Sequence, residues 1–127
     1  MRYVFLLLFV TACATQEPSP VETPAPPPAA TIPPKQEHVA IAGLLDSARK
    51  DASSGRLGSA AATLERALRI EPRNPRLWHE LALVRLRQAD YTQAESLAAR
   101  SNTYAGTDSE LRAANQKVIS DARAQRR

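Results

Sequence analysis

The sequence feature that most constrains the fold is an internal repeat with a period of 34 residues. A shift by this period places small or large apolar residues on residues of similar kind. The superimposed pairs are Leu44 and Trp78, Ala48 and Ala82, Gly55 and Ala89, Leu57 and Tyr91, Ala60 and Ala94, and Ala67 and Ser101. A repeat of this length is one supersecondary unit that cannot bury its apolar face alone, so neighbouring copies must stack.

Helical periodicity extends through the repeat region. Beyond residue 40, apolar residues recur at the three-to-four spacing of amphipathic helices, and the alternation typical of strands is absent. Ser-Gly, Pro-Arg-Asn-Pro, Ala-Asp and Ala-Gly-Thr-Asp segments interrupt the pattern. The sequence therefore predicts an all-α fold. The expected helices are 38–54, 58–70, 75–88, 91–102 and 108–124.

The period and the W-x-x-L-A pattern at Trp78, Leu81 and Ala82 resemble the tetratricopeptide repeat. The resemblance implies a short solenoid in residues 38–127, with repeats at about 41–74 and 75–108. Two repeats leave an apolar end exposed, so residues 109–125 are expected to form a capping helix. The fold serves many functions, so the resemblance indicates an architecture rather than an activity.

The predicted repeat core combines small and bulky side chains. Small residues let paired helices approach closely, and larger ones fill the remaining volume. We interpret the two aromatic residues of this set as core rather than as platforms for ligand stacking. The core residues are Ala48, Ala60, Trp78, Leu81, Ala82, Tyr91 and Ala94.

The amino terminus has the pattern of a secretory signal. Arg2 precedes an apolar run over residues 3–10. As a helix this run would rise roughly 12 Å, far short of the ~30 Å hydrocarbon core of a membrane, but it fits the apolar region of a signal peptide.

The single cysteine closes this run in the segment Val10-Thr11-Ala12-Cys13, and its solitude rules out a disulfide framework within one chain. The segment resembles a bacterial lipoprotein signal. The resemblance implies that residues 1–12 are removed and that Cys13 carries acyl chains such as palmitate, which anchor the protein to a membrane. Ala14, rather than Asp, after the cysteine implies an outer-membrane location facing the periplasm.

Residues 13–37 are predicted to be a disordered linker. Eight of the ten prolines lie between Pro18 and Pro34, and the segment has no aromatic residue and few large aliphatics. Such a segment cannot bury enough surface to offset its ordering entropy. At ~3.1 Å per residue in polyproline II, it would reach about 70 Å. We interpret it as a tether; a proline-rich docking peptide is the alternative.

The sequence offers little for catalysis. His38 and His79 belong to no H-E-x-x-H pattern, and neither G-x-S-x-G nor a phosphate-binding glycine loop occurs. We predict no catalytic residue, no metal, no cofactor and no small-molecule substrate. Residues 41–127 contain fifteen Lys and Arg against ten Asp and Glu. The predominance of arginine suits carboxylate-bearing partners, and the export signal argues against nucleic acid.

In tetratricopeptide arrays the first helix of each repeat lines an inner groove. Counting from the repeat boundaries, we expect a groove of leucines among basic residues, suited to an acidic amphipathic helix or an extended peptide. The expected groove residues are Leu45, Arg49, Ala52, Arg76, His79, Leu83, Leu86, Arg87 and Lys117.

The combination of lipoprotein signal, proline-rich tether and small repeat domain resembles the outer-membrane lipoproteins that activate penicillin-binding peptidoglycan synthases (Lpo type). It implies that the partner is an envelope protein, a bifunctional penicillin-binding protein. The alternative is a pilotin or assembly factor for an outer-membrane secretin or other envelope complex. A structural lipoprotein that binds the cell wall, and an enzyme, come after these.

Overall fold

The described part of the chain consists of five α-helices. A computed structural model describes residues 34–127, and the predicted signal peptide, Cys13 and most of the predicted linker lie outside them. The helices are α1 (Pro34–Ser53), α2 (Leu57–Ile70), α3 (Pro75–Arg87), α4 (Tyr91–Tyr104) and α5 (Ser109–Gln125). No strand occurs between residues 34 and 127. The predicted all-α solenoid is confirmed.

Helix α1 begins four residues before its predicted start at residue 38, within the stretch that we assigned to the linker. The physical reason is that proline is tolerated in the first turn of a helix, where the backbone N–H has no intrahelical acceptor in any case. Pro34 therefore starts the helix instead of preventing it. The other helix ends lie within two residues of the prediction.

Three helices begin at a polar residue that caps the exposed N–H groups of the first turn. The side-chain oxygens of Asn74, Asp90 and Asp108 accept hydrogen bonds from backbone N–H groups two or three residues later, at 3.0, 3.2 and 3.0 Å. Such caps satisfy donors that have no intrahelical partner. They explain why α3, α4 and α5 begin where they do.

The two helical hairpins turn in the same way. Gly55 ends α1 with φ of 78°, and Ala89, 34 residues later, ends α3 with φ of 61°. Glycine reaches this left-handed region without steric cost, whereas the Cβ of alanine crowds the following carbonyl. The second hairpin thus keeps the turn geometry of the first, although its residue fits that geometry poorly.

A carboxylate holds the first hairpin at its turn. Arg56 donates to Oδ1 of Asp51 from Nη2 at 2.6 Å and from Nε at 3.1 Å, and the Ser59 hydroxyl donates to Oδ2 at 2.7 Å. The hydrogen bond from Ser59, followed by that from Arg56, lowers the pKa of Asp51 below its ordinary value. The charged form of this carboxylate therefore links α1 to the start of α2.

Two apolar clusters form the core, and alanines at the helix contacts let the helices approach closely. The first cluster joins α1, α2 and α3, and the second joins α3, α4 and α5. Of the predicted core residues, Ala48, Ala60, Leu81, Ala82 and Ala94 are buried. Trp78 packs against the first cluster and Tyr91 against the second, and both are partly exposed.

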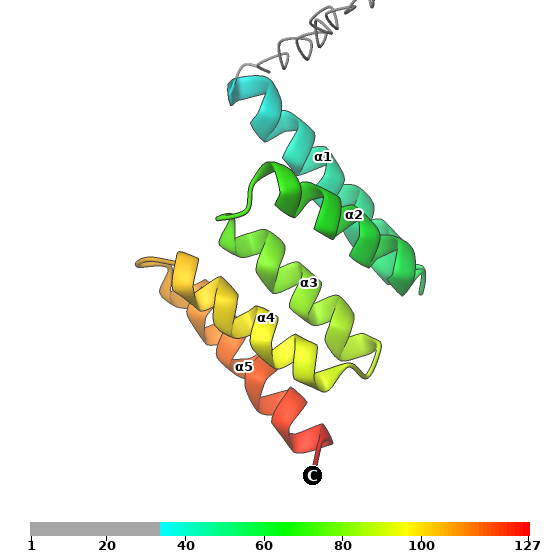
Figure 1. Ribbon diagram of the computed structural model, residues 1–127, viewed down its shortest axis with the longest axis vertical. Coiled ribbons are helices and arrows are strands. Elements are labelled where there is room, and N and C mark those ends of the chain that lie inside the picture. The colour runs from blue at the N-terminus through cyan, green and yellow to red at the C-terminus, as the bar shows by residue number, and fades with distance from the viewer. Residues whose placement is uncertain (1–33) are drawn as a thin grey trace, which may run out of the picture. The chain divides into compact units, whose positions relative to one another are not determined.

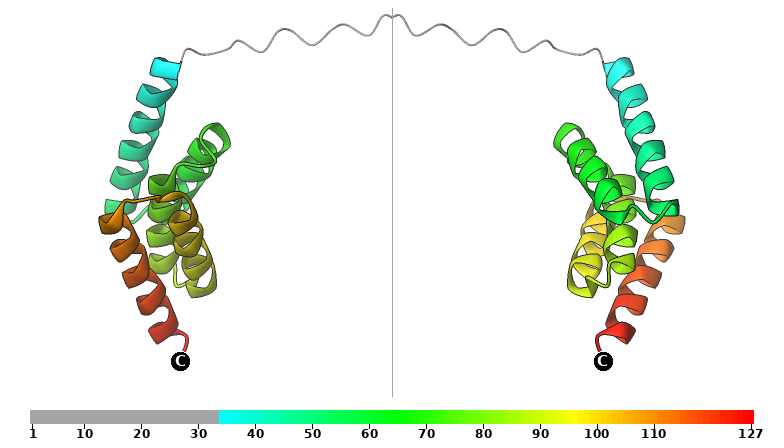
Figure 2. Two further views of the ribbon diagram at one scale, coloured as in Figure 1. Left: turned by 90° about the vertical axis from the view of Figure 1, so that its left-hand side faces the viewer. Right: turned by 90° about the vertical axis from the view of Figure 1, so that its right-hand side faces the viewer.

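Helix α3 is the central element, because it contacts all four other helices. The ribbon shows α2, α3 and α4 in succession down the array (Figure 1). From the side, α1 and α5 lie opposite α2 and α4, with α3 between them (Figure 2). The face formed by α1, α3 and α5 carries the candidate site.

Candidate partner-binding groove

Three cavities follow α3 from its first turn to its last and share lining residues. The turn cavity, at the amino end of α3, measures about 630 Å³, the central cavity about 230 Å³, and the apolar cavity, at the carboxyl end, about 300 Å³. Arg76 lines the first two, and both Arg49 and Glu80 line the last two. The three cavities are therefore parts of one groove.

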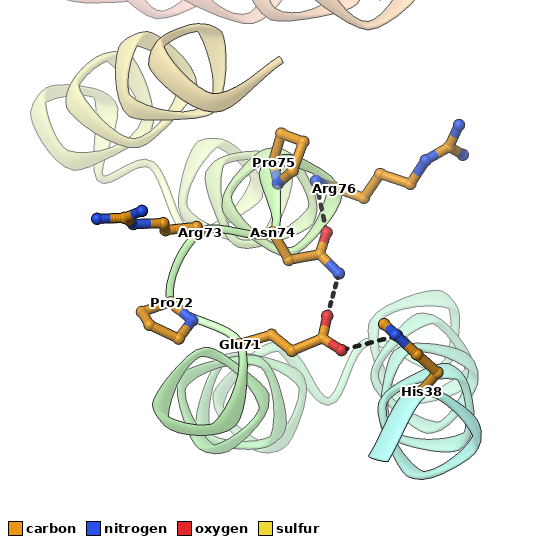
Figure 3. A pocket seen from close by; sticks show the side chains of 7 residues that line it. All are labelled: His38, Glu71, Pro72, Arg73, Asn74, Pro75 and Arg76. Atoms are coloured by element: carbon orange, nitrogen blue, oxygen red, sulfur yellow. Dashed lines mark hydrogen bonds and ion pairs between the residues drawn. The ribbon is translucent and has the colours of Figure 1, made fainter. Parts of the chain in front are cut away.

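The turn cavity lies between the start of α1 and the α2–α3 turn (Figure 3). His38 Nδ1 lies 3.1 Å from Oε1 of Glu71, and Asn74 Nδ2 donates to Oε2 at 2.7 Å. Both carboxylate oxygens of Glu71 are thus engaged, whereas the guanidinium groups of Arg73 and Arg76 extend outwards (Figure 3). This network ties the first turns of α1 to the turn that precedes α3.

In the central cavity, basic and acidic side chains meet one another. Arg49 on α1 donates to a single oxygen of Glu80 on α3, from Nε at 2.8 Å and from Nη2 at 2.6 Å. Arg76 on α3 lies 3.8 Å from the Asp108 carboxylate at the start of α5. The middle of the groove is therefore largely neutralised by the domain's own residues.

A buried polar chain connects His79 in the groove to the interior. His79 Nδ1 lies 2.7 Å from Oδ1 of Asn115 on α5, and Asn115 Nδ2 donates to the Ser101 hydroxyl on α4 at 2.8 Å. Ser101 in turn donates to the Pro75 carbonyl at 2.8 Å. Asn115 and Ser101 are both fully buried. The chain thus begins and ends on α3, passing through α4 and α5.

The order of donors in this chain sets the tautomer of His79. The Pro75 carbonyl can only accept, so the one hydroxyl proton of Ser101 points to it. The Ser101 oxygen must then accept from the amide NH₂ of Asn115, which turns the amide oxygen of Asn115 towards His79. Nδ1 of His79 therefore carries a proton, and in the neutral ring Nε2 does not.

The apolar cavity lies between the last turns of α1 and α3. Ala52, Leu83, Val84 and Leu86 supply its apolar lining. Arg49, Ser53, Glu80 and Arg87 supply its polar lining. Within residues 34–127, Arg87 is the cation of this set that forms no ion pair.

The structure brings most of the predicted groove residues together. Leu45 instead packs against the first core cluster, and Lys117 is 76% exposed and pairs with Asp121 at 3.0 Å, so neither lines the three cavities. The remaining predicted residues line them: Arg49, Ala52, Arg76, His79, Leu83, Leu86 and Arg87.

Sequence reasoning missed the acidic side of the groove. Glu80 is four residues after Arg76 on α3 and so shares its helix face, a spacing that could have revealed it. Asp108, Glu110 and Leu111 come from the α5 amino terminus, whose position depends on tertiary packing and on no pattern within α3.

No group of three or more His, Cys, Asp and Glu side chains in residues 34–127 is arranged to hold a metal ion. Among the helices of this range, none combines the length and apolar character needed to cross a membrane.

The stacked helices and the groove along α3 define a short helical-repeat domain of the protein-binding type. The family model described as tetratricopeptide repeat matches residues 52–118. The chain belongs to the tetratricopeptide-repeat family.

The chain is also similar to a solved structure, the globular C-terminal domain of P. aeruginosa LpoP. The two are 43% identical, the match covers 68% of this chain and 81% of that one, and the TM-score is 0.67. A comparison with curated proteins found no match. The family and this similarity identify an Lpo-like domain of the adaptor type.

Proposed function

We propose that the protein is a lipid-anchored, periplasm-facing adaptor of the outer membrane that binds and activates a bifunctional penicillin-binding peptidoglycan synthase. The observation that carries the proposal is the 43% identity with the LpoP domain over 68% of this chain. Together with the lipoprotein signal at Cys13 and the proline-rich segment after it, this similarity favours an Lpo-type activator over other repeat adaptors. The domain acts by binding and performs no chemistry of its own.

Activation requires the adaptor to bind one conformation of the synthase better than another. A ligand shifts a conformational equilibrium only by its difference in affinity for the two states. A tenfold preference for the active state changes the active-to-inactive ratio by up to tenfold, equivalent to about 1.4 kcal/mol. The groove along α3 is the surface that supplies the contacts with the synthase.

The anchor and the tether set how far the domain can act from the membrane. Because α1 begins at Pro34, the tether between Cys13 and the domain is twenty residues, 14–33. In polyproline II this length spans about 60 Å. The 20-residue helix α1 adds about 30 Å along its axis. The groove thus contacts its partner well above the membrane surface.

Reconstitution tests the proposal. The full chain, purified with its anchor in detergent, is mixed with the bifunctional synthase of the same organism, and glycan polymerisation from lipid-linked precursor is followed. We expect a stable complex and faster polymerisation. Absence of both would overturn the proposal, and retention of a secretin in place of the synthase would support the pilotin alternative.

A further inference from the structure

We infer that the partner contributes an acidic segment that inserts one bulky apolar side chain into the apolar cavity and pairs a neighbouring carboxylate with Arg87. This inference names the chemistry that the groove recognises. It rests on the proposed function only for the identity of the partner.

The first argument is the uneven charge along the groove. In the central cavity, Arg49 is bound to Glu80 at 2.6 Å and Arg76 lies 3.8 Å from Asp108. A partner carboxylate there would have to compete with carboxylates already in place. Arg87 forms no ion pair with any residue of 34–127, so it is the cation of the groove that a partner can neutralise without displacing anything.

The second argument is the composition of the cavity next to Arg87. Its lining includes Leu83, Val84 and Leu86 from α3 and Ala52 from α1, and its volume is about 300 Å³. An apolar recess of this size accepts a single leucine, phenylalanine or tryptophan side chain, which is the usual form of an anchor residue in a protein interface.

The third argument is the ion pair that bounds the cavity. Arg49 and Glu80 reach towards each other from α1 and α3 and line both the central and the apolar cavity. An anchor side chain on the carboxyl side of this pair stays beside Arg87. An arginine offers several N–H donors in a planar fork that matches a carboxylate, so the apolar anchor and the charge act on adjacent parts of one segment.

Peptide selection tests the inference without the synthase. A random-peptide phage library is selected against the full chain in detergent, and again against Arg87→Glu. We expect the wild-type protein to enrich a large apolar residue beside Asp or Glu, and the variant to lose these peptides and favour Lys or Arg. The best wild-type peptide should bind Arg87→Glu about tenfold or more weakly.

The matched control is Arg66→Glu, an equal charge change at an exposed arginine of α2 outside the groove. It should bind the peptide like the wild type, and circular dichroism should show all three proteins folded. The inference is overturned if no acidic peptide is enriched, if nothing is enriched, or if Arg87→Glu binds the selected peptide unchanged.

Binding of the synthase itself separates the two proposals. If the synthase binds the wild-type chain and Arg87→Glu equally well, the inference is wrong and the proposed function stands. If the peptide selection gives the expected pattern but the synthase does not bind at all, the inference stands and the proposed function is wrong.

Discussion

Arg49 and Glu80 join α1 to α3 across the groove, with two guanidinium nitrogens 2.8 and 2.6 Å from one carboxylate oxygen. The two helices have few other contacts, so this pair is a main link between the first helices of the two repeats. Sequence analysis placed Arg49 among the residues that meet a partner. In the structure its charge is already matched within the domain, which shifts the emphasis for partner charge to Arg87.

The Arg49–Glu80 pair should contribute measurably to stability. Glu80 is 17% exposed and Arg49 50% exposed, so we expect a coupling free energy of about 0.5–1 kcal/mol in a double-mutant cycle of Arg49→Met and Glu80→Gln. Urea unfolding followed by the fluorescence of Trp78, the single tryptophan, provides the measurement. The exposed Lys117–Asp121 pair on α5 is the control, with about 0.3–0.5 kcal/mol expected. Equal coupling in the two cycles would contradict the structural role of the groove pair.

Replacing Asn115 should change both stability and the tautomer of His79. Asn115→Leu strands the Ser101 hydroxyl oxygen and removes the acceptor for Nδ1–H of His79. We expect a loss of about 1–3 kcal/mol in the free energy of unfolding. Nitrogen chemical shifts should report the Nδ1–H tautomer in the wild type and a shift towards Nε2–H in the variant.

His38 is the internal control for this experiment, because it is exposed and lies at the other end of the α1–α3 face. Its nitrogen shifts should not respond to Asn115→Leu. A wild-type His79 with its proton mainly on Nε2 would show that the chain of donors runs differently.

The two hairpin turns should respond oppositely to exchange of Gly and Ala. Ala89 is exposed and has φ of 61°, so Ala89→Gly relieves strain without loss of packing, and we expect a gain of about 0.5 kcal/mol. Gly55→Ala places a Cβ at φ of 78° and should cost about 1 kcal/mol. Thermal and urea unfolding measure both. If Ala89→Gly destabilises the domain, the left-handed turn at this position is not a source of strain.

The carboxylate of Asp51 should titrate below the ordinary range of Asp, because Ser59 and Arg56 donate hydrogen bonds to its charged form. Since the folded-state pKa is the lower one, the stabilisation is present above the ordinary Asp pKa and is lost as the pH falls through the folded-state pKa. Ser59→Ala should raise the pKa of Asp51 towards its ordinary value, as measured by carbon NMR of the carboxyl group. Ser53→Ala, which removes a hydroxyl bonded to the Lys50 carbonyl instead, should leave this titration unchanged.

Lipidation predicts a specific effect of changing Cys13. Cys13→Ser should abolish incorporation of labelled palmitate and release the protein from the membrane fraction. Ala14→Asp is the matched control, because it should keep the label and change only the sorting between membranes. Continued membrane retention of Cys13→Ser with an uncut signal would contradict the lipoprotein assignment.

How far the sequence predicts the fold can be followed at particular residues. The 34-residue period predicts the five helices because each turn carries its own signal, such as the glycine at position 55 or the Asn-Pro pair at 74–75. It misplaces the start of α1, because Pro34 resembles the prolines of the linker and only the helix that follows distinguishes it.

The groove is predicted less completely. Residues of α3 are found because they share one helix face, whereas Leu45 and Lys117 depend on how α1 and α5 are rotated about their axes. The burial of Asn115 has no signal in the sequence at all. An asparagine within an amphipathic helix reads as exposed, and only the neighbouring Ser101 and His79 make its burial affordable.

The polar chain from His79 to Asn115 has an apolar counterpart one repeat earlier. Positions 34 residues before His79, Ser101 and Asn115 are Leu45, Ala67 and Leu81, which contact one another in the first core cluster. The two interfaces of the array thus have the same geometry but opposite chemistry. If α5 docked in place of α3, it would bury the Asn115 amide against leucine and alanine without hydrogen bonds, and α3 in place of α5 would strand Ser101 and His79. The order in which the helices assemble, and the end at which the array stops, are therefore specified by chemical identity and not by shape alone.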